Sequence, residues 1–222
     1  MPSHFQLNGF ESLFLQTTLV RIPLDNFQLD NSTQDESVSW YALFHGRTIA
    51  NLNLLKEVPT KVKGPKFVFA HLIIPHPPYV FSPNGDFVQA SLRNDSYIFD
   101  LTTPGVDKPG YTNSIRFINS AILKVVDKIL ADSKTPPVII IQGDHGASRY
   151  NKHEQRLSIL NVYYFPKQAA RDALYPSITP VNTFRILFDA YFGQNLPLLP
   201  DVSRYMPPNS SWSFETVPNP CQ

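Results

Sequence analysis

An aspartate and a histidine stand side by side at the end of an apolar run, in the segment VIIIQGDHG. Asp144 and His145 follow residues 138–141, and Gly146 lets the backbone turn sharply. Because a turning chain no longer alternates faces, both side chains can reach one cation, and this donor pair suits zinc or manganese. The alternative is a strand-end loop in which Asp144 caps a backbone group and His145 is merely exposed. Two ligands do not complete a site, so the pair alone leaves both interpretations open.

A second histidine lies in a proline-rich loop, within HLIIPHPPYVF. Three prolines flank His76, namely Pro75, Pro77 and Pro78. Proline restricts the backbone, so the imidazole of His76 is held with little freedom. Such a histidine can donate to an anionic oxygen or transfer a proton near neutral pH. The alternative is a structural loop in which His76 packs on Tyr79.

Cationic side chains follow the Asp-His pair in the loop SRYNKHEQR, residues 148–156. Three of them are candidate substrate-binding residues: Arg149, His153 and Arg156. Cations beside a metal would bind the anionic oxygens of a phosphate or sulfate ester. For each residue taken singly, a solvated charged loop explains the pattern equally well.

The composition excludes several classes of protein. The 222 residues hold 19 Lys+Arg and 18 Asp+Glu, so no overall basic field would attract nucleic acid. Cys221 is the single cysteine, which excludes a disulfide scaffold and a cysteine-rich zinc module. No apolar run approaches the ~20 residues that span a bilayer. Although 21 residues are proline, 16 Phe and 10 Tyr argue for a folded domain.

Apolar runs alternate with amphipathic patterns along the chain. Helices are expected over residues 8–20, 38–55, 112–132 and 181–192, and strands over 66–74, 138–141 and 157–165. The run 66–74, KFVFAHLII, is almost continuously apolar, which predicts a strand buried on both faces and makes His71 a core histidine. The order predicts an α/β domain with a mostly parallel sheet. Ligands of such sheets bind beyond the carboxyl ends of strands, where His76 and Asp144 lie.

Two blocks resemble the sulfatase-like branch of the alkaline phosphatase superfamily. YTNSIRFINSAILKVVDKIL followed by PPVIIIQGDHG is similar to the C-terminal half of that family, and FAHLIIPHPPY looks like its substrate-histidine loop. The order of motifs agrees over residues 65–205. The resemblance implies a three-layer α/β/α domain with a mixed, mostly parallel sheet. It also implies that Asp144 and His145 bind a divalent metal ion (Zn, Mn, Mg or Ca) and that His76 contacts the transferred or leaving group.

The family chemistry is in-line attack by a metal-bound Thr, Ser or formylglycine on a phosphate or sulfate ester, with transfer to water or an alcohol. This chain departs from that pattern before residue 66, because it has no C/S-x-P-x-R motif and no strand ending in an acidic residue. Thr17 and Thr18 fall in an expected helix without an acidic neighbour. No nucleophile is therefore identified.

These departures predict that residues 1–222 form a single domain that is the C-terminal portion of a larger one. Residues 1–64 would be a helical and loop lead-in, 65–205 the family-like core and 206–222 an irregular tail. The missing half would lie upstream or on another chain. Relatives commonly carry membrane helices, which implies the extracytoplasmic face of the membrane for the parent protein.

Two other functions are compatible with parts of the sequence. A calcineurin-like metallophosphoesterase uses a G-D-x-H-G loop, but QGDHG is one residue short and the supporting D-x-H and G-N-H motifs are absent. A catalytically inactive domain that keeps the fold and serves as a binding or structural module would explain the missing nucleophile.

Overall fold

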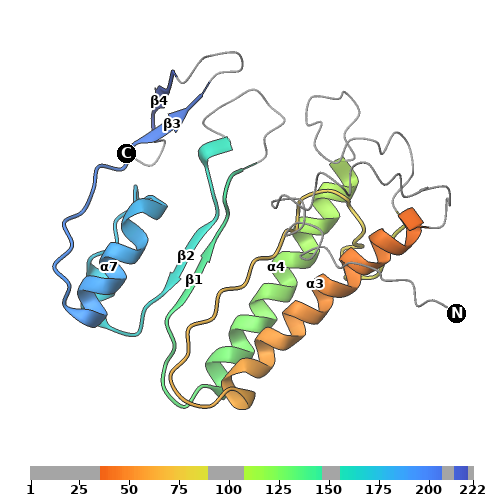
Figure 1. Cartoon of the computed structure of the whole chain (residues 1–222), viewed down its shortest axis with the longest axis horizontal. Coiled ribbons are helices and arrows are strands. Elements are labelled where there is room, and N and C mark those ends of the chain that lie inside the picture. The colour runs from red at the N-terminus through yellow and green to blue at the C-terminus, as the bar shows by residue number, and fades with distance from the viewer. Residues whose placement is uncertain (1–35, 90–107, 147–155, 207–212, 220–222) are drawn as a thin grey trace, which may run out of the picture. The chain divides into compact units, whose positions relative to one another are not determined.

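The computed structural model describes residues 36–89, 108–146, 156–206 and 213–219. The chain divides into two compact units, Met1–Trp40 and Tyr41–Gln222, and the second holds nearly all of the described residues. The elements are α3 (Glu36–Lys61, which begins in the first unit), α4 (Lys108–Asp132), β1 (Ile139–Gln142), β2 (Asn161–Tyr164), α6 (Gln168–Asp172), α7 (Pro180–Phe192), β3 (Ser203–Tyr205) and β4 (Glu215–Val217) (Figure 1). The helix expected over residues 8–20 lies outside the described residues.

The described part is a mixed α/β structure whose paired strands are antiparallel. β1 pairs with β2 in the register Ile139↔Tyr164 to Gln142↔Asn161, and β3 pairs with β4. The parallel pairing predicted from the sequence is not seen among the described residues. A physical reason is the backbone bonding just beyond β1: the amides of Gly143 and Gly146 donate to the carbonyls of Leu160 and Arg156, which extends the antiparallel pairing.

The strand predicted over residues 66–74 is wrong for the described structure. The segment is extended but joins no sheet, and Phe67 and Phe69 are each 81% exposed. His71 is also exposed, so the predicted core histidine is wrong too. In Figure 1 the segment (gold) runs back from the end of α3 in the direction in which β1 runs back from the end of α4. An apolar run becomes a strand only where a neighbour supplies backbone partners, and no described residue does so here.

The first hydrophobic core lies between α3, α4 and the chain that follows α3. Its buried members are Tyr41, Phe44, Leu52, Ile74, Val80, Phe81, Phe117 and Val125. Phe81 stacks on Phe117 with ring centroids 4.9 Å apart. The apolar stripe predicted for 112–132 is confirmed, since Ile118, Ala121, Ile122 and Ile129 of α4 pack on this core. Helix α4 begins four residues earlier than predicted.

The second hydrophobic core lies between the β1–β2 hairpin and α7. Phe165, Ala170 and Ile186 are buried in it, and Val138, Ile140 and Tyr163 pack against them. Helix α7 agrees with the prediction and ends at Gly193, whose φ of 64° is the left-handed conformation common after helices. The second core therefore packs helix α7 against the hairpin, whereas the first core takes in only Leu72 and Ile74 of the 66–74 segment.

The last part of the chain corrects a further prediction. The sequence predicts an irregular tail after residue 206, but Glu215–Val217 pairs with Ser203–Tyr205, and Val217 is buried. Three-residue strands contain too few residues for an alternation to stand out in the sequence. None of the described helices is long and apolar enough to cross a membrane.

Candidate functional site

The Asp144–His145 turn begins two residues beyond the end of β1, and backbone hydrogen bonds pin both of its sides. The amide of Gly143 donates to the carbonyl of Leu160 at 2.9 Å, and the amide of Gly146 donates to the carbonyl of Arg156 at 2.6 Å. These two bonds extend the β1–β2 pairing on both sides of the Asp144–His145 pair, so the hairpin fixes the backbone of that pair.

The two side chains lie close enough to share one ion. The amide of His145 donates to Asp144 Oδ1 at 2.9 Å. His145 Nδ1 lies 2.8 Å from the carbonyl of Gly146, which places the ring proton on Nδ1 and leaves the lone pair on Nε2. Nε2 is 3.7 Å from Asp144 Oδ2. A tetrahedral ion with bonds of about 2.1 Å separates its ligand atoms by about 3.4 Å, so a small adjustment would let both atoms bind it.

Solvent reaches this pair. The Asp144 side chain is 89% exposed and that of His145 is 35% exposed. No group of three His, Cys, Asp or Glu side chains that could hold a metal ion occurs in the described ranges. Catalytic zinc sites typically use three protein ligands plus water. The described residues thus provide two donors of suitable chemistry and geometry and no third.

His76 occupies the loop that follows the 66–74 segment. Its Nδ1 lies 2.7 Å from the carbonyl of Pro77, which orients the ring, and its amide donates to the carbonyl of Ile73. The Ile74–Pro75 and Pro77–Pro78 peptide bonds are cis. The side chain is partly buried. Both hydrogen bonds lie within the loop itself, and neither joins His76 to the Asp144–His145 turn.

The structure places one of the three candidate substrate-binding residues at the turn. Arg156 lies there because its carbonyl accepts the Gly146 amide. Arg149 and His153 lie outside the described residues. The turn therefore combines a carboxylate, an imidazole and an arginine backbone within one short stretch of the hairpin.

A buried polar network beneath the turn is not predicted by the sequence. Gln142 Nε2 donates to Asn161 Oδ1 and to Thr183 Oγ1, each at 2.8 Å, and Tyr163 Oη lies 2.8 Å from the same threonine oxygen. Thr183 is 1% exposed. Because Gln142 precedes Asp144 by two residues, the network fixes the end of β1 to α7. The available signal was a polar pair, Asn182 and Thr183, on the same helix as Ile186 and Ala190, which are buried or packed in the second core.

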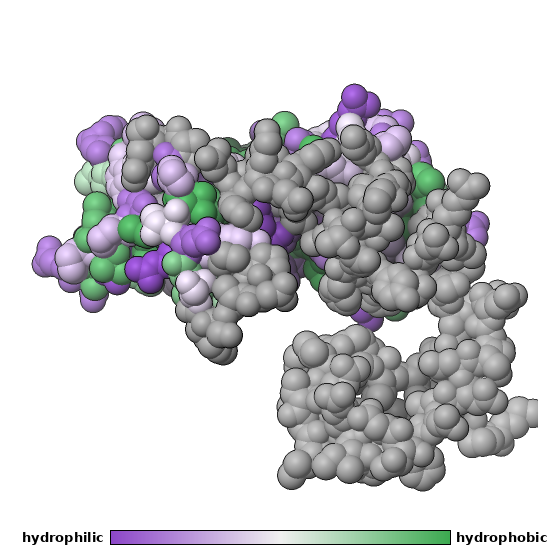
Figure 2. Space-filling model, turned by 90° about the horizontal axis from the view of Figure 1, so that it is seen from above, coloured by the Kyte–Doolittle hydropathy of each residue, from purple (hydrophilic) through white to green (hydrophobic). Residues whose placement is uncertain are grey.

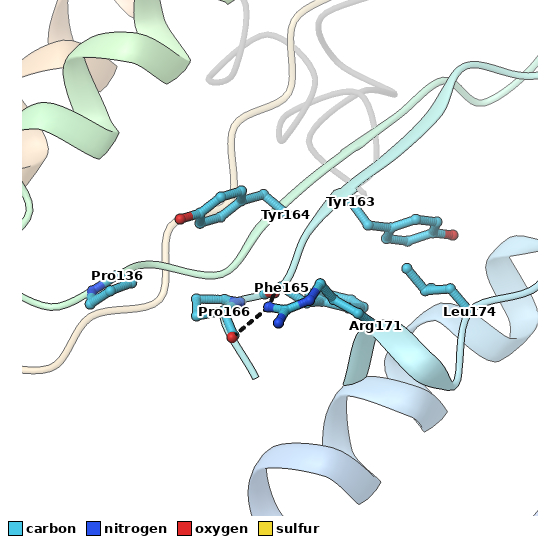
Figure 3. A pocket seen from close by; sticks show the side chains of 7 residues that line it. All are labelled: Pro136, Tyr163, Tyr164, Phe165, Pro166, Arg171 and Leu174. Atoms are coloured by element: carbon cyan, nitrogen blue, oxygen red, sulfur yellow. Dashed lines mark hydrogen bonds between the residues drawn. The ribbon is translucent and has the colours of Figure 1, made fainter. Parts of the chain in front are cut away.

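A hollow of about 470 Å³ lies at the other end of the hairpin (Figure 3). It is lined by Pro136, Tyr163, Tyr164, Phe165, Pro166, Arg171 and Leu174. Arg171 donates to the carbonyls of Phe165 and Pro166 at 2.7 and 2.6 Å, so its guanidinium already ties the end of β2 to α6. This hollow is remote along the strands from Asp144, and its cation is already bonded to backbone oxygens.

Comparison with models of protein families, with curated proteins and with solved structures finds no match to this chain. The functional argument therefore rests on the residues and on their geometry.

Proposed function

We propose that the chain carries half of the metal site of a hydrolase or transferase acting on phosphate or sulfate esters. The observation that supports this is the separation of 3.7 Å between His145 Nε2 and Asp144 Oδ2, together with the bond that ties Nδ1 to Gly146. An oriented imidazole whose second nitrogen is bonded to a carbonyl is the usual state of a metal-binding histidine. Asp144 and His145 would hold a divalent ion, either Zn, Mn, Mg or Ca.

The remaining roles follow from charge and position. A bound divalent ion would polarise the ester oxygens and lower the pKa of an attached nucleophile. His76, oriented through its Nδ1, would contact the transferred or leaving group through Nε2, accepting a proton as the neutral ring or donating one as the imidazolium. Arg156 and, by sequence, Arg149 and His153 would bind the anionic oxygens of the substrate.

The proposal includes a larger domain than the described residues form. The third ligand and the nucleophile would come from a missing N-terminal half, upstream or on another chain, and the complete domain would be a three-layer α/β/α structure with a mostly parallel sheet. The parent protein would act at the extracytoplasmic face of the membrane. The shared direction of the 66–74 segment and β1 supports this, because it brings their carboxyl ends to the same side (Figure 1).

Calorimetric titration of the purified chain with Zn²⁺ and Mn²⁺ tests the half-site. We expect weak binding of one ion, and at least about tenfold weaker binding in Asp144→Ala and in His145→Ala, since each removes half of the protein ligands. His71→Ala and Asp127→Ala are matched controls because both residues are exposed and lie outside the turn. Unchanged binding in both turn variants would contradict the metal site.

Hydrolysis of p-nitrophenyl phosphate and p-nitrophenyl sulfate tests whether the chain lacks part of the active site. A half-site without its nucleophile should give little or no hydrolysis. Robust turnover that Asp144→Ala abolishes would show that the described residues already form a complete site.

A second candidate is a catalytically inactive domain that serves as a binding module. Figure 2 shows hydrophobic residues, in green, at the surface of the described part, and Phe67 and Phe69 are among the most exposed. Absence of metal binding combined with capture of a polypeptide partner would favour this candidate over the enzyme half.

A further inference from the structure

The 66–73 segment exposes most of its side chains and packs only at its end. Phe67, Val68 and Phe69 are 81%, 47% and 81% exposed. Leu72 and Ile74 pack in the core between α3 and α4, whereas Ile73 between them is 53% exposed. Such alternation at its end is that of a β-strand, whose successive side chains point to opposite faces. The segment is therefore an extended chain that is anchored at its carboxyl end and exposed along most of its length.

Its backbone has no partner either. Within the described residues, positions 66–72 make no backbone hydrogen bond, and the first one beyond them joins the amide of His76 to the carbonyl of Ile73. Extended chain with unpaired N–H and C=O groups is a template for an added strand. A lipid bilayer would cover the phenylalanines but would leave these groups unsatisfied. A second strand would cover the exposed phenylalanines and would also form hydrogen bonds with the backbone groups.

Charge specifies the chemistry of that strand. Residues 58–85 contain no Asp or Glu, and Lys61, Lys63 and Lys66 stand exposed at the start of the segment. Lys61 pairs with Glu57 at 2.7 Å, but Lys63 and Lys66 form no ion pair to any residue in the described ranges. Opposite charges across an interface steer association and fix its register. The partner strand should carry carboxylates at the end that meets these lysines.

The same charges argue against a second copy of this chain. In a parallel pair of 66–73 segments, lysines would face lysines. In an antiparallel pair, the lysines would face residues 73–78, which contain no acid. Neither arrangement offers a carboxylate.

We propose that the 66–73 segment binds an extended apolar strand of a partner polypeptide by β-addition, with acidic residues of that strand beside Lys63 and Lys66. The proposal uses no residue of the Asp144–His145 turn, so it stands or falls separately from the metal site.

Fluorescence anisotropy with the full chain provides the test. The probe is a labelled nine-residue peptide of alternating valine and threonine that begins with two glutamates. One control peptide has lysines in place of the glutamates, and another carries methyl groups on its backbone nitrogens. We expect both controls to bind at least about tenfold more weakly, the first from charge and the second from lost backbone hydrogen bonds. Hydrogen exchange should show new protection of the amides of residues 67–72.

Variants of the chain locate the binding. Phe69→Asp should abolish binding of the glutamate peptide, whereas Leu54→Asp, at an exposed leucine of α3, should leave it unchanged. The double charge reversal Lys63→Glu with Lys66→Glu should invert the preference, so that the lysine peptide binds more tightly. This inversion distinguishes lost contact from lost folding, because an unfolded variant would bind neither peptide.

Three results would overturn the proposal. The first is equal binding of the methylated peptide, which would mean that no strand is added. The second is a dimer, seen in sedimentation and dissociated by Phe69→Asp, which would make the occupant a second copy. The third is Phe69-dependent sedimentation with anionic phospholipid vesicles and no peptide binding, which would make it a membrane.

Discussion

Two apolar runs in this chain follow prolines at the end of long helices, yet only one forms a strand. Ile139–Gln142 pairs along its whole length with Asn161–Tyr164. Residues 66–74 are longer and at least as apolar, and they pair with no described residue. The two runs also differ in burial, because each residue of β1 is partly buried, whereas only Leu72 and Ile74 of the 66–74 segment pack in a core. Among the described residues, only β1 has a neighbouring strand that satisfies its backbone.

The two regions also differ in their polar interiors. Around the hairpin, Gln142 donates to Thr183, and Asn182 donates to the carbonyl of Leu199. Around the 66–74 segment the core is made chiefly by aromatic and aliphatic contacts. If the comparison is correct, the core beside the 66–74 segment should respond most to changes of shape, and the hairpin region to both shape and hydrogen bonding.

The largest effect is expected at Gly85, which sits against the first core. Its φ is +95°, and a Cβ there would lie 2.4 Å from Cε2 of Phe117, which is itself stacked on Phe81. Gly85→Ala should lower the free energy of unfolding by about 3 kcal/mol, from strain and overpacking. Urea denaturation measures this. Gly46→Ala in α3, with no atom within 4 Å of the added carbon, should be neutral or stabilising. Similar losses in both variants would mean that this core is not specifically packed.

The next effect separates the two apolar runs directly. Ile140 packs in the second core and is paired with Tyr163, so Ile140→Ala should cost about 2 kcal/mol. Thermal unfolding and urea denaturation both report it. An effect near zero would mean that β1, like the 66–74 segment, contributes little to the free energy of unfolding, and the two runs would then not differ.

A smaller, pH-dependent effect is expected at Asp201, which caps α7 from a distance. Burial raises the pKa of this carboxyl, but hydrogen bonds from the Thr179 side chain, Tyr175, the Thr179 amide and Asn182 outweigh it, and the net pKa is below its ordinary value of 3.8. Its stabilisation is therefore present above that value and is lost as the pH falls through the lower folded pKa. Asp201→Asn should cost about 1 kcal/mol at pH 7. The gap to the unsubstituted chain, measured by urea denaturation, should close below about pH 4; a gap that persists in acid would assign it to packing.

The smallest effect is expected at the bare face of the 66–74 segment. Phe67→Ala should change the free energy of unfolding by less than about 0.5 kcal/mol, because the ring is 81% exposed. Chemical denaturation with and without the glutamate peptide checks this. A large loss in the isolated chain would show that Phe67 is already buried against another part of it.

Local elements and the chemistry of the turn could be predicted from the sequence. The apolar stripe of α4 and the Gly193 end of α7 depend on residues a few positions apart, and those spacings are visible in one chain. The proximity of Asp144 to His145 follows from their adjacency beside a glycine. The Gln142–Thr183 bond could not be predicted, because it joins residues 41 positions apart.

By itself, the sequence determined the apolar stripe of α4, the bounds of α4 and α7 within a few residues, and that a carboxylate and an imidazole share a turn. It did not determine the end of α3, which continues through Pro59 to Lys61, six residues beyond the predicted end. Tertiary structure alone decided which apolar run received a strand partner, that the hairpin is antiparallel, and that α7 fixes the end of β1. The physical reason is the separation along the chain of the residues that interact. Helical hydrogen bonds close within four residues, whereas a strand's backbone must be satisfied by a segment that the local pattern does not name.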